Sequence, residues 1–186
     1  DFQGRDMVIA RSGFSKQGGF EIYVPDHELG MPLWHALMEA GRDLDVRAGC
    51  PNGIERVEGG LLSYGNDMTR ENTPHEAGLG RFCNTARVTG CIGREALLRM
   101  DRDGPTRQIR PIAIDSRALP RCDRPWALMD GTRSVGQITS AAQSPDFGCG
   151  VAIGMIAHSH WAAGTAVQVE TQDGRFPAVV RNGFWI

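Results

Sequence analysis

The chain has 186 residues, of which 41% are hydrophobic and 23% are charged, and its formal net charge is −2 at pH 7. This composition is typical of a globular protein that buries a sizeable core, and it excludes disordered and fibrous classes. Lys16 is the single lysine, and the arginines are scattered rather than gathered into the basic stripe of a nucleic-acid-binding protein. We therefore expect no nucleic-acid partner.

The cysteines are odd in number, widely spaced and without a CxxC pair, which predicts reduced thiols rather than a zinc or redox site. They are Cys50, Cys83, Cys91, Cys122 and Cys149. The sequence has no apolar run of about 18 residues and no signal-peptide pattern, so we expect a cytoplasmic protein without a membrane partner. Because the first residue is Asp1 and not Met, we also expect a piece of a longer protein.

Two short apolar runs near the start, Met7 to Ala10 and Gly19 to Val24, are joined by a segment rich in glycine and serine, which predicts a β-hairpin. In a strand, alternate side chains face the same side. Glu21 and Tyr23 should therefore share one face, about 7 Å apart, with Ile22 on the other. A carboxylate and a phenol would then share one surface.

Three helices are predicted next. The first begins at Gly30, ends at Gly41 and has an apolar stripe whose Trp34 we expect in the core. The second begins with a capping box at Asn52 and runs toward Leu62, followed by a turn at Ser63 to Asp67. The third covers Ile92 to Met100 and stops before Gly104 and Pro105.

Short β-like runs with turns between them fill the rest of the chain. They are Ile109 to Ile114, Ala127 to Met129, Val135 to Ala141, Val151 to Ala157, Ala166 to Thr171 and Phe176 to Arg181. Two Asp-Gly pairs among them predict hairpins, and the whole predicts an antiparallel barrel or sandwich. The predicted fold class is α+β, with an α+β module at residues 1–103 and an antiparallel β-barrel at residues 104–186.

Most residues that could serve in catalysis or metal binding lack the neighbouring residues that such a site requires. His158 and His160 would share one side of a strand, but no third ligand stands at a matching local spacing, so we predict no metal site and expect a solvated strand end. No GxSxG elbow or phosphate-binding loop occurs, and Cys50 has no evident histidine partner. Acyl-transfer and nucleotide-binding functions are therefore not supported.

The segment Arg11 to Val24 instead resembles the hairpin motif S-R-T-G-Y-T-G-E-D-G-F-E-I of the glycine-cleavage T-protein superfamily. A second block, Ile54 to Met68, is similar to that family's S-L-R-L-E-A-G-L-x-L-Y-G-N-D-I without a gap. Within the superfamily, Gly19 to Val24 and Cys50 to Arg56 look most like the dimethylsulfoniopropionate demethylases, with the aminomethyltransferases second. The resemblance implies the C-terminal half of such an enzyme, with an N-terminal half as its missing partner.

The resemblance also implies tetrahydrofolate as cofactor and gives site residues. Glu21 would accept two hydrogen bonds from the pterin edge, and Phe14 would pack on the ring system. Tyr23 would contact folate or lie against a sulfonium. Arg56 would bind the glutamyl carboxylate. From the residues alone, Glu21 would be interpreted as a solvated strand glutamate, and the resemblance reverses that interpretation. Phe14 is also open as a core anchor at the hairpin tip, and Arg56 as a helix-face ion pair with a neighbouring glutamate.

The activity so implied is direct methyl transfer from dimethylsulfoniopropionate, a small-molecule substrate, to tetrahydrofolate. Two alternatives stay open, an aminomethyltransferase of the glycine cleavage system and a non-catalytic folate-binding module. No catalytic residue can be named, because the family's aspartate would lie in the N-terminal half. We expect this chain by itself to be inactive.

Overall fold

A computed structural model describes residues 1–14, 16–50, 53–87 and 90–186. The chain forms two compact units, Asp1–Asn52 and Gly53–Ile186, and each is described by itself. The division expected between residues 103 and 104 stays a prediction.

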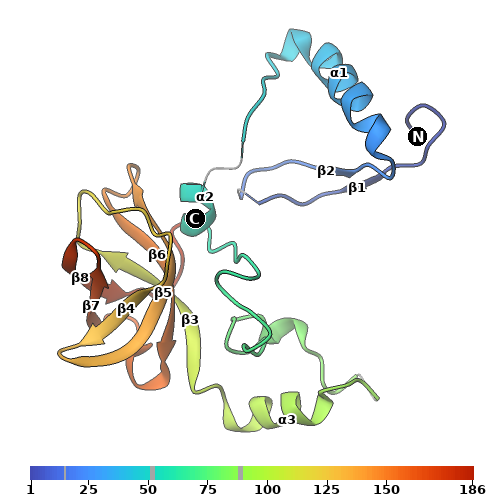
Figure 1. Ribbon diagram of the computed structural model, residues 1–186. Helices are drawn as coiled ribbons and strands as arrows, with labels where there is room; N and C mark the ends of the chain where they lie inside the picture. The colour runs from blue at the N-terminus through green and yellow to red at the C-terminus, as the bar shows by residue number, and fades with distance from the viewer. Residues whose placement is uncertain (15, 51–52, 88–89) are drawn as a thin grey trace. The chain divides into compact units, whose positions relative to one another are not determined.

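The first unit contains the predicted hairpin and the predicted first helix, drawn in blue in Figure 1. Strands β1 (Val8–Ala10) and β2 (Glu21–Tyr23) pair antiparallel, with Ile9 opposite Ile22. A 3₁₀ turn, η1 (His27–Leu29), leads into α1 (Gly30–Ala40), and a second, η2 (Arg42–Leu44), follows it. Both predictions are confirmed.

The expected burial of the α1 stripe is wrong. Trp34 is 45% exposed and Leu37 is 46% exposed, and α1 contains no buried residue. The described part of this unit offers two three-residue strands and one helix, which is too little apolar surface to enclose an indole. Trp34 therefore lies on the surface of the first unit.

The second unit begins with α2 (Gly53–Glu58), which is shorter than the expected helix to Leu62. The helix ends because Gly60 adopts φ +64°, its N–H donates to Val57 O, and the N–H of Leu61 donates to Arg56 O at 3.0 Å. This is the Schellman pattern of helix termination. The expected N-cap, Asn52, lies outside the described residues.

A 3₁₀ turn, η3 (Gly80–Phe82), precedes the third helix, α3 (Arg94–Asp103). This helix confirms the predicted one, although it begins two residues later and extends three residues further. It ends at Gly104, which has φ +74° and donates its N–H to Met100 O. Asp101 on α3 accepts hydrogen bonds from Thr85 and His75, which ties the helix to the preceding loop.

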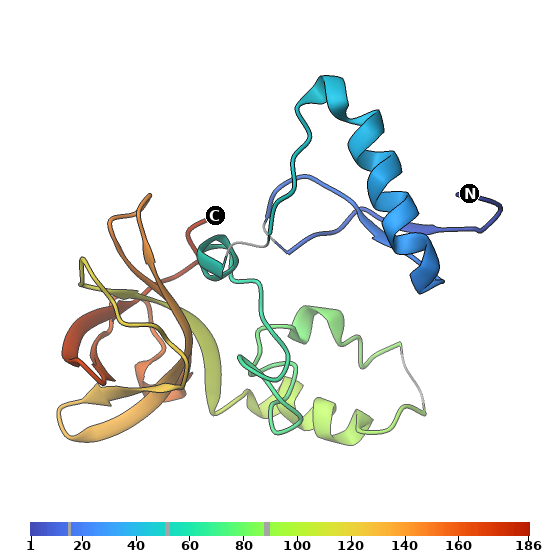
Figure 2. The same ribbon diagram turned by 45° about the horizontal axis from the view of Figure 1, so that its top comes forward.

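The predicted β-runs form a closed antiparallel barrel in the order β3-β6-β5-β4-β7-β8. Its strands are β3 (Arg107–Ile114), β4 (Trp126–Asp130), β5 (Arg133–Ser144), β6 (Cys149–Ala157), β7 (Ala166–Thr171) and β8 (Gly174–Val180). Figures 1 and 2 show the barrel in yellow to red from two directions. The expected α+β class with an antiparallel barrel is confirmed.

Aliphatic side chains make the barrel core, and Ile112, Leu128, Ile138 and Val169 are each fully buried in it. A second core cluster joins the barrel to α2 through Val57, which is 3% exposed. The element α2 therefore packs against the barrel.

The two histidines expected at a strand end lie instead in a 3₁₀ turn, η4 (His158–His160). The ring of His158 lies 4.3 Å from that of Trp161, whereas His160 hydrogen-bonds to Asp130 and Ser159. A turn does not keep the two-residue period of a strand, so the imidazoles find different partners.

Among the residues that the structure describes, no helix is long and apolar enough to span a membrane.

Candidate functional site

The hairpin presents Glu21 and Tyr23 on its exposed side. Both are exposed, Tyr23 by 57%, while Ile22 between them is half-buried. The hydroxyl of Ser12 donates a hydrogen bond to the carboxylate of Glu21. This bond gives the carboxylate a preferred orientation and leaves its other oxygen for further donors. The pairing of Ser12 with Glu21 was not foreseen from the sequence.

Phe14 lies in the loop that joins the two strands, and it is 43% exposed. Arg11, at the start of the same loop, lays its guanidinium over the ring of Phe20, 5.1 Å from the ring centroid. The cation–π contact in this hairpin is therefore made to Phe20, and the ring of Phe14 stays partly open to a ligand.

Arg56 on α2 is held by three acceptors. Its Nη1 donates to Asp67 Oδ2 at 2.7 Å and to Leu61 O at 2.8 Å, and its Nη2 donates to Ser140 Oγ at 2.5 Å. The side chains of Arg56 and Asp67 are 16% and 0% exposed. An ion pair was one of the two expectations for Arg56, but its partner is this buried aspartate rather than a neighbouring glutamate.

Asp67 ends the predicted turn after α2 and joins that turn to the barrel. Its Oδ1 accepts from Thr139 Oγ1 at 2.7 Å and Ser140 Oγ at 2.6 Å, and its Oδ2 also accepts from Ser63 N at 2.8 Å. Neighbouring residues of a regular strand face opposite sides, but β5 has a β-bulge between Ile138 and Ser140. The bulge turns both hydroxyls toward the same carboxylate. We call Arg56, Asp67, Thr139 and Ser140 the Asp67 clamp.

The sequence-predicted residues are thus distributed over both units. Phe14, Glu21 and Tyr23 belong to the hairpin of the first unit, and Arg56 belongs to the second unit. Their contacts with folate stay predictions.

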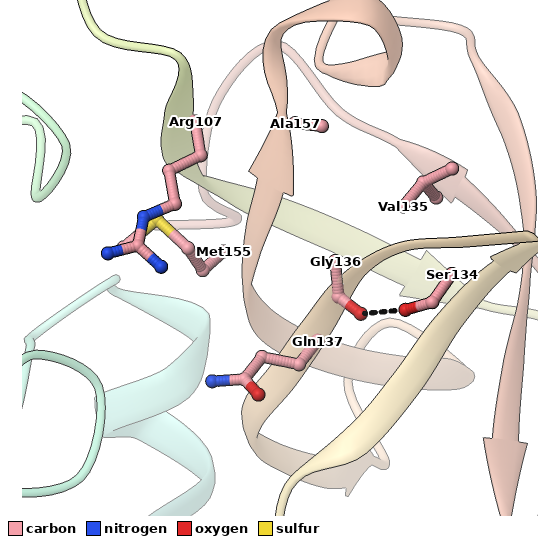
Figure 3. A pocket seen from close by; sticks show the side chains of 7 residues that line it. All are labelled: Arg107, Ser134, Val135, Gly136, Gln137, Met155 and Ala157. Atoms are coloured by element: carbon pink, nitrogen blue, oxygen red, sulfur yellow. Dashed lines mark hydrogen bonds between the residues drawn. The ribbon is translucent and has the colours of Figure 1, made fainter.

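A pocket of about 290 Å³ lies where β3, β5 and β6 meet, and Figure 3 shows Arg107 beside Met155, with Gln137 on β5. Arg107 Nε donates to Glu76 Oε1 at 2.7 Å. Burial alone would raise the pKa of Glu76, but the hydrogen bond from Arg107 and that from Thr73 N lower it. Since Glu76 already balances the arginine, this pocket offers an anion little uncompensated charge.

Comparison with known proteins places the chain in a family. A family model described as the GCVT N-terminal domain matches residues 1–87, and one described as the glycine cleavage T-protein C-terminal barrel domain matches residues 107–184. The chain belongs to the glycine-cleavage T-protein family. The resemblance inferred from the two sequence blocks is confirmed.

Among relatives, the chain is 61% identical over 184 residues to dimethylsulfoniopropionate demethylase DmdA of Ruegeria pomeroyi, covering 99% of this chain and 50% of that protein. It is 35% identical over 168 residues to an aminomethyltransferase of Symbiobacterium thermophilum, covering 88% and 43%. The crystal structure of glycine cleavage system aminomethyltransferase T from Bartonella henselae matches with a TM-score of 0.80 at 26% identity, covering 98% and 50%. The chain spans about half the length of these relatives.

Proposed function

We propose that the full-length protein containing this chain transfers a methyl group from dimethylsulfoniopropionate to tetrahydrofolate. The observation that carries this proposal is the 61% identity to a dimethylsulfoniopropionate demethylase along 99% of the chain. Identity to the aminomethyltransferase of Symbiobacterium thermophilum is 35%. Both kinds of enzyme belong to the same family, and the higher sequence identity to the demethylase favours demethylase activity.

In the proposed reaction, N5 of tetrahydrofolate attacks one methyl carbon of the sulfonium. The new N–CH₃ bond forms as the S–CH₃ bond breaks, the electron pair stays on sulfur, and N5 loses its proton. The products are 5-methyltetrahydrofolate, methylthiopropionate and a proton. Because the sulfonium is already a good leaving group, alignment of the two reactants and exclusion of water would carry most of the catalysis.

The hairpin supplies chemistry that suits this reaction. The carboxylate of Glu21 would accept the N–H and NH₂ of the pterin edge, in the orientation that Ser12 favours. Phe14 would contact the ring system. Tyr23, exposed on the same face as Glu21, would contact folate or place its ring against the sulfonium.

Arg56 completes the proposal as the residue that meets the glutamyl carboxylate. Its charge is balanced by Asp67, so it would act on the glutamyl carboxylate through the N–H groups not engaged in its bonds to Asp67, Leu61 and Ser140, which fix the plane of the guanidinium. The proposal places the remainder of the site in the N-terminal half of the full-length protein. It also places the reaction in the cytoplasm, where the free cysteines of this chain would stay reduced.

The proposal is tested by incubating the full-length protein with tetrahydrofolate and dimethylsulfoniopropionate. We expect methylthiopropionate and 5-methyltetrahydrofolate in equal amounts. Formation of methylenetetrahydrofolate with glycine-cleavage partner proteins, and no methylthiopropionate, would instead identify an aminomethyltransferase. If tetrahydrofolate binds but neither product forms, the protein is a non-catalytic folate-binding module.

A further inference from the structure

The turn that follows α2 presents an aromatic side chain to solvent. Tyr64 is 67% exposed, yet the turn that carries it is closely tied, since Asp67 N donates to Ser63 O at 2.8 Å and Gly65 N donates to Met68 O at 2.7 Å. Binding residues are disproportionately carried by loops that a rigid scaffold positions.

The Asp67 clamp fixes this turn to the barrel. Asn66, next to Asp67, adds a hydrogen bond from its side-chain amide to Ser140 Oγ at 2.8 Å and another to Thr139 O at 3.1 Å. The residues on either side of Tyr64 are therefore both held by hydrogen bonds. Ser63 N donates to Asp67, and Gly65 N donates to Met68 O. Because the backbone that carries Tyr64 is already ordered, a ligand that stacks on the ring would have to order only its side-chain torsions.

We propose that Tyr64 is a further ligand-binding residue, which stacks on the p-aminobenzoyl ring of folate. This inference rests on the proposed function. In folate, that ring lies directly before the glutamyl group, which is the part assigned to Arg56. Arg56 and the backbone N–H of Ser63, the residue before Tyr64, both donate to Asp67 Oδ2. The second unit would therefore supply both an aromatic face and a guanidinium for this end of the cofactor.

The experiment uses the full-length protein and two probes, tetrahydrofolate and p-aminobenzoylglutamate, which lacks the pterin. Dissociation constants are measured by calorimetry for Tyr64→Ala, Tyr64→Phe and Glu21→Gln. Phe82→Ala is the matched control, since Phe82 is 70% exposed and lies on η3, outside the clamped turn.

We expect Tyr64→Ala to raise the dissociation constants of both probes by about threefold to tenfold, which is the usual contribution of an aromatic stack to binding. Tyr64→Phe keeps the ring and should stay within about twofold of the parent protein. Glu21→Gln should lower the affinity for tetrahydrofolate and leave the affinity for p-aminobenzoylglutamate unchanged. Phe82→Ala should change neither.

Two results would overturn the inference. One is an unchanged affinity in Tyr64→Ala while Glu21→Gln weakens tetrahydrofolate, which would leave the proposed function intact. The other is an equal loss in Tyr64→Ala and Phe82→Ala, which would indicate a general effect of removing surface aromatic rings. Failure of the parent protein to bind tetrahydrofolate at all would reject the proposed function itself, and this inference with it.

Discussion

Replacement of Asp67 by Asn should destabilise the second unit strongly. The amide keeps the shape of the carboxylate, and the hydroxyl of Thr139 can rotate to accept from it. Ser140 Oγ, in contrast, already accepts from Arg56 and Asn66 and would lose its acceptor. What the substitution removes is the charge opposite Arg56, whose side chain is 16% exposed. Loss of one partner of a buried ion pair costs about 3 to 5 kcal/mol, and we expect a cost in this range.

The assay is native-state amide hydrogen exchange of β5 and β6 in the 186-residue chain, which reports the free energy of opening the barrel. The control is Glu170→Gln, which removes the same kind of charge from a pair with Arg175 whose side chains are 47% and 45% exposed. An exposed pair contributes about 0 to 1 kcal/mol. If Asp67→Asn lowers the free energy of opening by no more than Glu170→Gln does, the ion pair of Asp67 with Arg56 does not stabilise the barrel as proposed.

The remaining predictions concern a close strand contact and an acid-sensitive carboxyl group. Gly136→Ala should destabilise the barrel in thermal unfolding, because a Cβ there would collide with the carbonyl oxygen of Met155 on β6. Gly183→Ala is the control and should be neutral, because a Cβ there meets nothing within 4 Å. Asp101 has a pKa below its usual 3.8, because it accepts hydrogen bonds from Thr85 and His75. Its contribution to stability is present above that usual value and is lost as the pH falls through the lowered pKa. Asp101→Asn should therefore flatten the acid limb of a plot of stability against pH, and an unchanged slope would contradict this reasoning.

Local sequence signals were sufficient for most secondary structure. The Asp130-Gly131 and Asp173-Gly174 pairs stand where the structure has the β4–β5 and β7–β8 hairpins. The second helix was predicted too long, because apolar periodicity continues to Leu62 while Gly60 has already ended the helix. Apolar periodicity does not reveal a glycine with positive φ. The Gly59-Gly60 pair is the feature of the sequence that indicates the end of the helix.

The site was less predictable, because its contacts join residues far apart in the chain. The alternation of Glu21 and Tyr23 followed from strand period, but the bond from Ser12 depends on how the hairpin closes. Asp67 is bonded to Ser140, and only the bulge in β5 brings Thr139 to the same side. Strand periodicity in the sequence predicts those two hydroxyls on opposite faces, so the clamp could not be foreseen.

The most direct test of the central claim follows a methyl carbon. The full-length protein is incubated with tetrahydrofolate and dimethylsulfoniopropionate carrying ¹³C in its S-methyl groups, and the folate product is examined by NMR. Methyl transfer predicts a ¹³C-methyl group on N5 in an amount equal to the methylthiopropionate formed. Methylthiopropionate accompanied by labelled methanol, with no label on folate, would contradict the claim.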